Sequence, residues 1–464
     1  EEMNSLRFDM NKLKPSFIIS IIYILPILMA GSIYIDDNTR VFRNFGWTVD
    51  GRYLSNLVYN VLSIGNGPLD FFPFTQIASV LILVISAAVI ARAVNFSSVT
   101  AITVAILSSP FLVQNLSYRL DSLTMAMSFL VILIPFLFTE RLILFFVVGI
   151  AAVVSSSFLY QVSVMAFPCM CMIYGATRSR TWSELFYLIL KSAAVFVVGL
   201  LAYIISAKLL GINSRSELFL SGSDPIGVLT KNASYVRDLV FNAFKSPLII
   251  VLAAYVILWA FCLYSSVKKG LRHVVMDLLF PILIAAISLS INVILLNPWI
   301  SSRALLVFPL VFVYFVTRCD FKAARNTLLI FSSVFSFGFC AVYANALKAQ
   351  DEYHYLVMSD IGKIMEETGR NSFVISGGMP FSEETRRAFE VYPLLNNIIP
   401  RYFKEGSGWG QVYARRVFNV RDLSVGEQLR EINNVCGNGW IKTNNLFYKK
   451  TELSVLIRFY PPDC

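Results

Sequence analysis

A series of apolar segments, each long enough to cross a lipid bilayer, dominates this sequence. A transmembrane helix needs roughly 17–25 mainly apolar residues because the hydrocarbon core of a bilayer is about 30 Å thick. Hydrophobic residues make up 56% of the 464 residues, and the chain is predicted to be an α-helical polytopic membrane protein. About eleven such segments occur, at 16–35, 73–94, 97–117, 122–138, 142–159, 161–177, 188–210, 246–267, 273–296, 303–318 and 324–345.

The connections between these segments are of two alternating kinds. Short connections rich in lysine and arginine alternate with connections that carry aspartate, arginine and aromatic side chains. Because cytoplasmic loops carry an excess of basic residues, the basic connections are predicted to be cytoplasmic, with the N-terminus inside and the C-terminus outside. The basic residues are Arg7, Lys12, Lys14, Arg92, Arg141, Arg178, Arg180, Lys268, Lys269, Arg272, Arg318, Lys322 and Arg325.

The last part of the chain, from residue 346 onward, has the pattern of a small soluble α/β domain. A helix is expected to end near Gly369 because apolar residues recur at helical spacing before that glycine. Ser424 and Glu427 fit a capping box that begins a second helix. Runs of β-forming residues predict strands at 373–376, 445–449 and 454–460.

Two domains are therefore predicted, a transmembrane domain at residues 1–345 and an external α/β domain at residues 346–464. Cys436 and Cys464 fall in the external domain, where an oxidising environment permits a disulfide. The sequence leaves open whether these two cysteines pair.

Charge and histidine content argue against two classes of function. The formal net charge is +10, but no basic helix or stripe occurs, and many lysines and arginines lie at the ends of apolar segments. Nucleic acid is therefore not an expected partner. The chain has only two histidines, His273 and His354, so a histidine-based triad or a histidine-rich zinc site is disfavoured.

Two adjacent carboxylates, Asp36 and Asp37, directly follow the first apolar segment. Carboxylates at the edge of a membrane span are costly to bury, so a functional role is expected. One of them is a candidate general base that deprotonates a hydroxyl nucleophile. The alternative is a solvated loop in which an aspartate caps the next helix. Because neighbouring carboxylates repel each other, a raised pKa, an arginine partner or a divalent metal ion is expected to relieve the repulsion.

Further polar residues fall in the connections on the same predicted outer side. Arg119 and Asp121 either pair with each other or leave Arg119 available for a phosphate, which suits its fork of N–H donors. Arg303 begins a segment on the outer side, where the positive-inside rule disfavours arginine. Its preferred interpretation is a lipid-phosphate contact, with snorkelling to the interface as the alternative. The other candidates for substrate contact are Arg40, Asp50, Arg52, Tyr160 and Gln161.

These residue types together suit the transfer of a sugar from a lipid-linked phosphate. A carboxylate takes the proton of the accepting hydroxyl, and arginines neutralise the lipid phosphate as it leaves. Such a reaction needs no histidine, which agrees with the composition.

One stretch of the sequence resembles a known family. The run from Tyr34 to Asn60, YIDDNTRVFRNFGWTVDGRYLSNLVYN, resembles the bacterial and phage serotype-converting O-antigen glucosyltransferases. Leu-Tyr-Gln at 159–161, Ser-Ser-Arg at 301–303 and the order of apolar segments extend the resemblance over most of the chain. Members of this family are polytopic inner-membrane enzymes of the GT-C class.

The resemblance implies a donor, an acceptor and a catalytic group. The implied donor is undecaprenyl-phosphate glucose, which partner proteins make and flip across the membrane. The implied acceptor is a sugar hydroxyl of lipid-linked O-antigen on the periplasmic face of the bacterial inner membrane. A catalytic aspartate in the first outer loop carries over to Asp36 or Asp37. The phosphate contacts of Arg119 and Arg303 are inferred from their chemistry and not from the resemblance.

Three other functions stay open at this point. Another GT-C transferase would use a different sugar or acceptor. A flippase for lipid-linked sugars would favour charges deep within spans, whereas these charges gather at one face. An O-antigen polymerase would need no separate sugar donor on a lipid phosphate.

Overall fold

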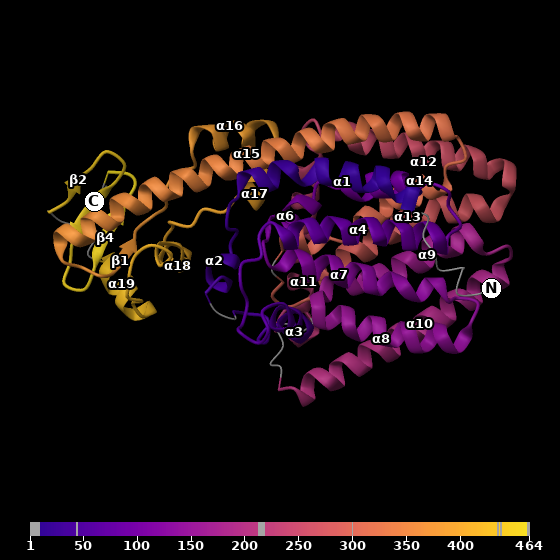
Figure 1. Ribbon diagram of the computed structural model, residues 1–464, viewed down its shortest axis with the longest axis horizontal. Helices are drawn as coiled ribbons and strands as arrows, with labels where there is room; N and C mark the ends of the chain where they lie inside the picture. Colours follow the sequence, from indigo (N-terminus) through magenta and orange to yellow (C-terminus); the bar gives the residue numbers. More distant parts are fainter. Residues whose placement is uncertain are drawn as a thin grey trace.

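A bundle of long helices makes up most of the computed structural model, which describes residues 10–42, 45–211, 219–298, 300–433, 436 and 439–461 (Figure 1). The bundle encloses one large apolar core. Its helices are α1 (Met10–Ala30), α4 (Phe74–Ala93), α5 (Val99–Leu107), α6 (Leu112–Ser117), α7 (Asp121–Leu133), α8 (Leu142–Tyr160), α9 (Ala166–Arg178), α10 (Trp182–Leu209), α12 (Ile249–Lys269), α13 (Leu271–Ile294), α14 (Pro309–Arg318) and α15 (Lys322–Thr368).

Seven helical segments within the described residues are long and apolar enough to cross a membrane, which supports a polytopic membrane protein. One of them, Leu142–Arg178, contains α8, a 3-10 turn η3 (Gln161–Met165) and α9. The chain reverses within it, because Arg178 at its end pairs with Glu140 just before its start, at 3.7 Å. The predicted total of about eleven spans and the orientation of the chain stay predictions.

Several predicted spans differ from the helices in the structure. The segment at 97–117 is divided into α5 and α6 around Pro110, and the segment at 303–318 into a 3-10 turn η5 (Ser302–Leu305) and α14, which begins at Pro309. Proline lacks the backbone N–H that a helix interior uses, which favours both divisions, although α1 and α13 continue through Pro26 and Pro281. The first helix ends at Ala30, and Gly31 follows with φ +61°.

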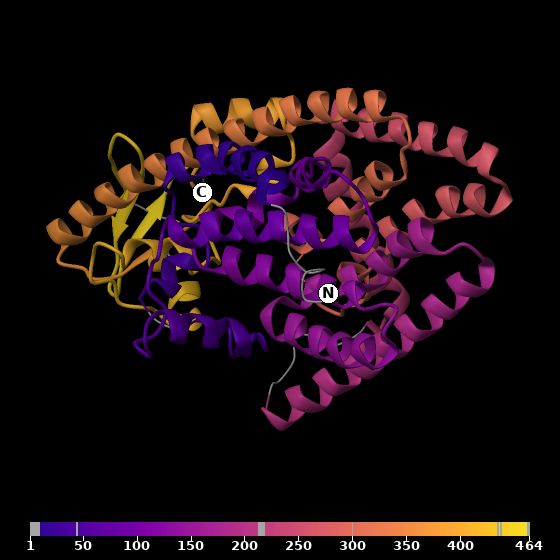
Figure 2. The same ribbon diagram turned by 45° about the vertical axis from the view of Figure 1, so that its right-hand side comes forward.

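Short helices cover the end of the bundle at which α1 ends. Figure 1 shows α3 (Tyr53–Leu62) almost end-on, so its axis lies across the bundle helices, and Figure 2 shows it from the side. The very short helix α2 (Asp37–Arg40) lies at the same end. The remaining elements outside the C-terminal part are α11 (Pro225–Phe244) and two 3-10 turns, η4 (Phe219–Ser221) and η2 (Ile134–Leu137), of which η2 lies near the opposite end of the bundle.

The C-terminal part contains a four-stranded sheet in the order β1-β4-β3-β2. β1 is parallel to β4, and the other pairs are antiparallel. The predicted strands at 373–376, 445–449 and 454–460 correspond to β1, β3 and β4. The elements are β1 (Phe373–Ile375), β2 (Ile441–Lys442), β3 (Phe447–Lys450), β4 (Val455–Arg458), α16 (Glu383–Val391), α17 (Leu395–Ile398), α18 (Trp409–Ala414) and α19 (Val425–Asn433).

α15 joins the bundle to the sheet without interruption. It extends from the bundle along the upper edge of Figure 1 to the sheet, where its last turns share an apolar core with the strands. The predicted domain boundary at 345/346 therefore falls inside a continuous helix, which ends at Gly369 as expected. Cys436 is disulfide-bonded, and Cys464 lies outside the described residues.

Candidate active site

Polar residues from distant connections meet at the end of the bundle where α1 ends. Asp36 and Asp37 stand at the start of α2, Arg119 and Asp121 precede or begin α7, and Arg303 lies in η5. The two outermost of these positions, Asp36 and Arg303, are 267 residues apart in sequence, yet their side chains are in direct contact. The structure thus brings together most of the residues that the sequence singled out.

Asp121 is the centre of a largely buried group of charges. Its carboxylate accepts hydrogen bonds from the Arg40 guanidinium and, at 2.6 Å, from Trp47 Nε1. Arg52 Nη1 lies 3.4 Å from the same carboxylate. The ring of Trp47 stacks on Tyr59, with centroids 4.8 Å apart. This arrangement fixes the first loop onto the start of α7, because a buried carboxylate is stable only when its partners stay in place.

Tyr160, Gln161 and Asp50 extend this group. The Arg52 guanidinium carbon lies 4.8 Å from the centroid of the Tyr160 ring, within cation–π range. The Tyr160 hydroxyl donates to the Arg303 carbonyl oxygen at 3.0 Å. Gln161 Nε2 donates to the Asp50 carbonyl oxygen at 2.6 Å. Two candidates for substrate contact, Tyr160 and Gln161, therefore use these polar atoms for hydrogen bonds within the protein.

Asp37 is buried and carries an unsatisfied oxygen. Its Oδ2 accepts from the Arg119 backbone N–H at 2.6 Å, while Oδ1 has no hydrogen-bond partner among the described residues. Burial raises the pKa of the Asp37 carboxyl well above its usual value, and the charge of Asp121 raises this pKa further. The protein environment therefore makes this carboxyl harder to ionise than the same carboxyl in water.

Replacing Asp37 with asparagine is expected to change how stability depends on pH. A raised pKa means that the folded protein holds a proton that the unfolded chain releases near pH 4. Wild-type stability therefore falls as pH rises above about 4, by at most about 1.4 kcal/mol per pH unit from this group. Thermal unfolding of both proteins between pH 4.5 and 8 measures the effect. Parallel curves for wild type and Asp37→Asn would contradict it.

Asp36 differs from its neighbour because it faces the surface in part. Its side chain is 15% exposed, and its Oδ2 lies 3.2 Å from Arg303 Nη1 and 3.5 Å from Arg40 Nη2. Arg303 Nη1 also donates to the Tyr118 hydroxyl at 2.6 Å. The Arg303 side chain is likewise 15% exposed. Asp36 and Arg303 are thus a carboxylate and a guanidinium in contact with each other and with the outside.

Arg119 has a different partner from the one considered in the sequence. Its Nη1 pairs with Asp70 at 2.6 Å, and its other guanidinium nitrogens donate to the carbonyl oxygens of Ser32 and Gly31. The pair between Arg119 and Asp121 does not form. The Arg119 guanidinium therefore holds the end of α1 and the second half of the first loop, with most of its donors in use.

Arginines supply the positive charge beside the aspartate pair. Arg40 lies between Asp36 and Asp121, and Arg303 lies against Asp36. Within the part of the chain that the structure describes, no group of three or more His, Cys, Asp or Glu side chains is arranged to hold a metal ion.

Three contributors to the site were not recognised from the sequence. Tyr118 lies in a short connection, Asp70 lies far along the first loop, and Gln114 lies inside a predicted span. Gln114 Oε1 accepts from the Arg303 backbone N–H at 2.6 Å, and its Nε2 donates to the Tyr34 hydroxyl at 3.1 Å. A glutamine within an apolar segment was the one available signal.

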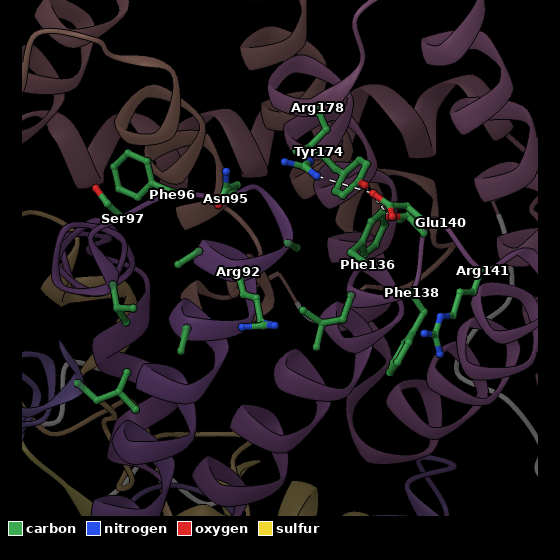
Figure 3. A pocket seen from close by; sticks show the side chains of 17 residues that line it. Arg92, Asn95, Phe96, Ser97, Phe136, Phe138, Glu140, Arg141, Tyr174 and Arg178 are labelled. Atoms are coloured by element: carbon green, nitrogen blue, oxygen red, sulfur yellow. Dashed lines mark hydrogen bonds and ion pairs between the residues drawn. The ribbon is translucent and has the colours of Figure 1, made fainter. Parts of the chain in front are cut away.

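The cavity shown in Figure 3 lies at the opposite end of the bundle. Its volume is about 600 Å³, and Leu13 near the start of α1 is among its lining residues. Arg92, Arg141 and Arg178 also line it, and all three belong to the basic connections. It therefore has no part in the arrangement around Asp36.

Comparison with known proteins identifies two similarities. A family model described as glucosyl transferase GtrII matches residues 25–317. A protein of Salmonella phage P22, described as an uncharacterized 55.3 kDa protein in the gtrB 5' region, is 22% identical over 482 residues, which cover 93% of this chain and 94% of that protein. No solved structure matches the chain.

Proposed function

Because this chain belongs to the glucosyl transferase GtrII family, we propose that it transfers glucose from undecaprenyl-phosphate glucose to a hydroxyl of lipid-linked O-antigen. The observation that carries the proposal is the contact between Asp36 and Arg303, a partly exposed carboxylate and guanidinium 3.2 Å apart at one end of an apolar bundle. A base and a phosphate-binding cation in contact are the two groups that this transfer requires.

The two aspartates have different roles in this proposal. Asp36 is partly exposed and lies against two arginines, so an acceptor hydroxyl can reach its carboxylate. Asp37 is buried with no exposed side-chain surface, so an acceptor hydroxyl has no direct path to its oxygens. Asp36 is therefore the general base, and Asp37 holds the Arg119 backbone N–H that precedes Asp121.

The reaction is a direct displacement at the anomeric carbon of the donor. As the acceptor oxygen forms a bond to that carbon, its proton moves to an oxygen of Asp36. The bond between the anomeric carbon and the phosphate oxygen breaks, and undecaprenyl phosphate leaves with the electron pair. Arg303 neutralises the charge that develops on the phosphate, so no acid is needed for the leaving group.

The proposed location is the bacterial inner membrane, with the site facing the periplasm. Seven apolar helices support a membrane location. The basic residues Arg92, Arg141 and Arg178 lie around the cavity at the other end of the bundle, and the positive-inside rule makes that end cytoplasmic. Proteins that make the donor and flip it across the membrane are then functional partners. Membership of a glucosyl transferase family favours transfer over a flippase or a polymerase.

A reconstituted assay tests the proposal directly. Purified protein in detergent or nanodiscs is given polyprenyl-phosphate glucose and lipid-linked O-antigen, and the glycan product is measured by mass spectrometry. A mass increase of one hexose that depends on both substrates is expected. Transfer from a nucleotide sugar in the absence of the lipid donor would overturn the assignment of the donor. So would a lack of transfer from the lipid donor under conditions in which a known glucosyltransferase uses the same donor preparation.

Replacing Arg303 with glutamine is expected to raise the KM for the lipid donor by about 10–100-fold. The reason is that a hydrogen bond to a charged group contributes about 1.5–3 kcal/mol, and about 1.4 kcal/mol corresponds to a factor of ten. Initial rates at varied donor concentration measure it. Arg237 in α11 is exposed and pairs with Asp238, so Arg237→Gln is the matched control. Equal KM values in the two variants would remove Arg303 from the donor site.

A further inference from the structure

The first loop is held by a residue from the far end of the chain. Tyr402 follows α17 and lies outside the residues matched by the family model, which end at 317. We propose that Tyr402 is a positioning residue that fixes the turn carrying Asp36 and Asp37. This inference rests on the proposed function, because its importance depends on Asp36 being the base.

The Tyr402 hydroxyl makes three hydrogen bonds, all to the first loop. It donates to the Ile33 carbonyl oxygen at 3.2 Å, and it accepts from the Ile35 backbone N–H at 2.9 Å and from Asn38 Nδ2 at 3.2 Å. A phenol has one donor and two acceptor positions, so this hydroxyl is fully used. Its three partners flank the aspartate pair on both sides.

The backbone at this point needs external support. Ile35, directly before Asp36, has φ +40°, in the left-handed region that a β-branched residue rarely adopts. A conformation of this kind persists when surrounding contacts determine it, and such residues cluster at functional sites. The hydrogen bond from the Ile35 N–H to Tyr402 is such a contact. Loss of this hydrogen bond is expected to let the backbone at Ile35 adopt a different conformation, which would displace the Asp36 side chain.

Two further contacts join the same parts of the chain. Arg416 Nη1 donates to Asn38 Oδ1 at 3.3 Å, so Asn38 is held at both ends of its amide by residues beyond 400. The Tyr34 hydroxyl donates to the Ile398 carbonyl oxygen. The segment from 398 to 416 therefore contacts the turn at several points. A change in this segment is expected to shift the position of the Asp36 carboxylate.

Tyr402→Phe is the decisive variant because it removes only the hydroxyl. Tyr413→Phe is its matched control: Tyr413 stacks on Tyr402 with centroids 5.0 Å apart, but its hydroxyl bonds to Asp351 instead of the first loop. Both variants lose one phenol oxygen from the same aromatic stack. Arg416→Gln is a second variant, which removes the contact with Asn38 and leaves the tyrosine in place.

The expected result is a fall in kcat of about 10²-fold for Tyr402→Phe, because misplacement of a reacting group by about 1 Å costs that much. The KM for the lipid donor should stay within about twofold, and Arg416→Gln should lower kcat in the same direction by a smaller factor. Thermal unfolding of Tyr402→Phe and Tyr413→Phe should be similar, which separates positioning from loss of folded protein.

Three outcomes would contradict either the positioning role or the proposed mechanism. If Asp36→Asn abolishes transfer while Tyr402→Phe and Tyr413→Phe have equal kcat values, the positioning role is wrong and the proposed function stands. If Asp36→Asn retains transfer, the proposed mechanism fails independently of Tyr402. A fall in kcat matched by an equal loss of folded protein would also reject positioning.

Discussion

Replacing Asp36 with asparagine is expected to lower the rate of glucose transfer by about 10²–10⁴-fold, the contribution usual for a general base. Asparagine has nearly the same shape and can still accept a hydrogen bond from Arg303, so the donor site should stay assembled. The loss should therefore appear in kcat, with little change in the KM for the lipid donor. Steady-state kinetics with purified protein, polyprenyl-phosphate glucose and acceptor measures both constants.

The neighbouring residue provides the control. Asp37→Asn keeps the oxygen that accepts from the Arg119 N–H, and it resembles the neutral acid that burial favours. We expect this variant to retain activity within about tenfold of wild type. The reverse pattern, with Asp37→Asn inactive and Asp36→Asn active, would exchange the roles of the two aspartates.

Replacing Asp121 with asparagine is expected to lower the free energy of unfolding by about 3–5 kcal/mol, because it leaves the buried Arg40 guanidinium without its main anionic partner. Arg40 is 1% exposed, and Asp121 is fully buried. The first loop should detach from α7, so transfer should fall along with stability. Chemical unfolding in mild detergent, followed by circular dichroism, measures the change.

A surface pair gives the matched comparison. Asp238 lies 2.9 Å from Arg237, but both side chains are more than half exposed. Asp238→Asn should change stability by less than about 1 kcal/mol, because water solvates exposed ion pairs well. If Asp121→Asn is no more destabilising than Asp238→Asn, the buried group of charges does not hold the loop.

The helical elements could be predicted because their signals are local. Apolar length located the segments that became α1, α4, α10, α12 and α13, and the capping box at Ser424 and Glu427 forms as expected, with mutual hydrogen bonds. The length of the apolar segments did not predict the divisions near Pro110 and Pro309. Proline is counted as an ordinary member of such a segment, although it lacks the backbone N–H that a helix interior uses. Apolar length also missed the continuation of α15 past residue 345, where the helix becomes polar but does not end.

Several residues of the polar group at this end of the bundle could be singled out from the sequence, but most of their partners could not. Asp36, Arg40 and Arg303 stood out because charge at the edge of an apolar segment is costly. The pair of Arg119 with Asp70, and the contacts of Tyr402 with Ile35, depend on how loops fold over the bundle. Residues separated by 367 positions leave no trace of their contact in a single sequence.

Because α15 is continuous, the number of residues in this helix determines how the C-terminal part is oriented relative to the bundle. The 47 residues of α15 extend roughly 70 Å at about 1.5 Å per residue, more than twice the thickness of a bilayer core. One residue added beyond 345 would rotate everything after it by about 100° around the helix axis. Tyr402 would then face away from the first loop. The rotational phase of this helix is therefore coupled to the contacts between Tyr402 and the first loop, and an insertion or deletion within the helix is expected to break them.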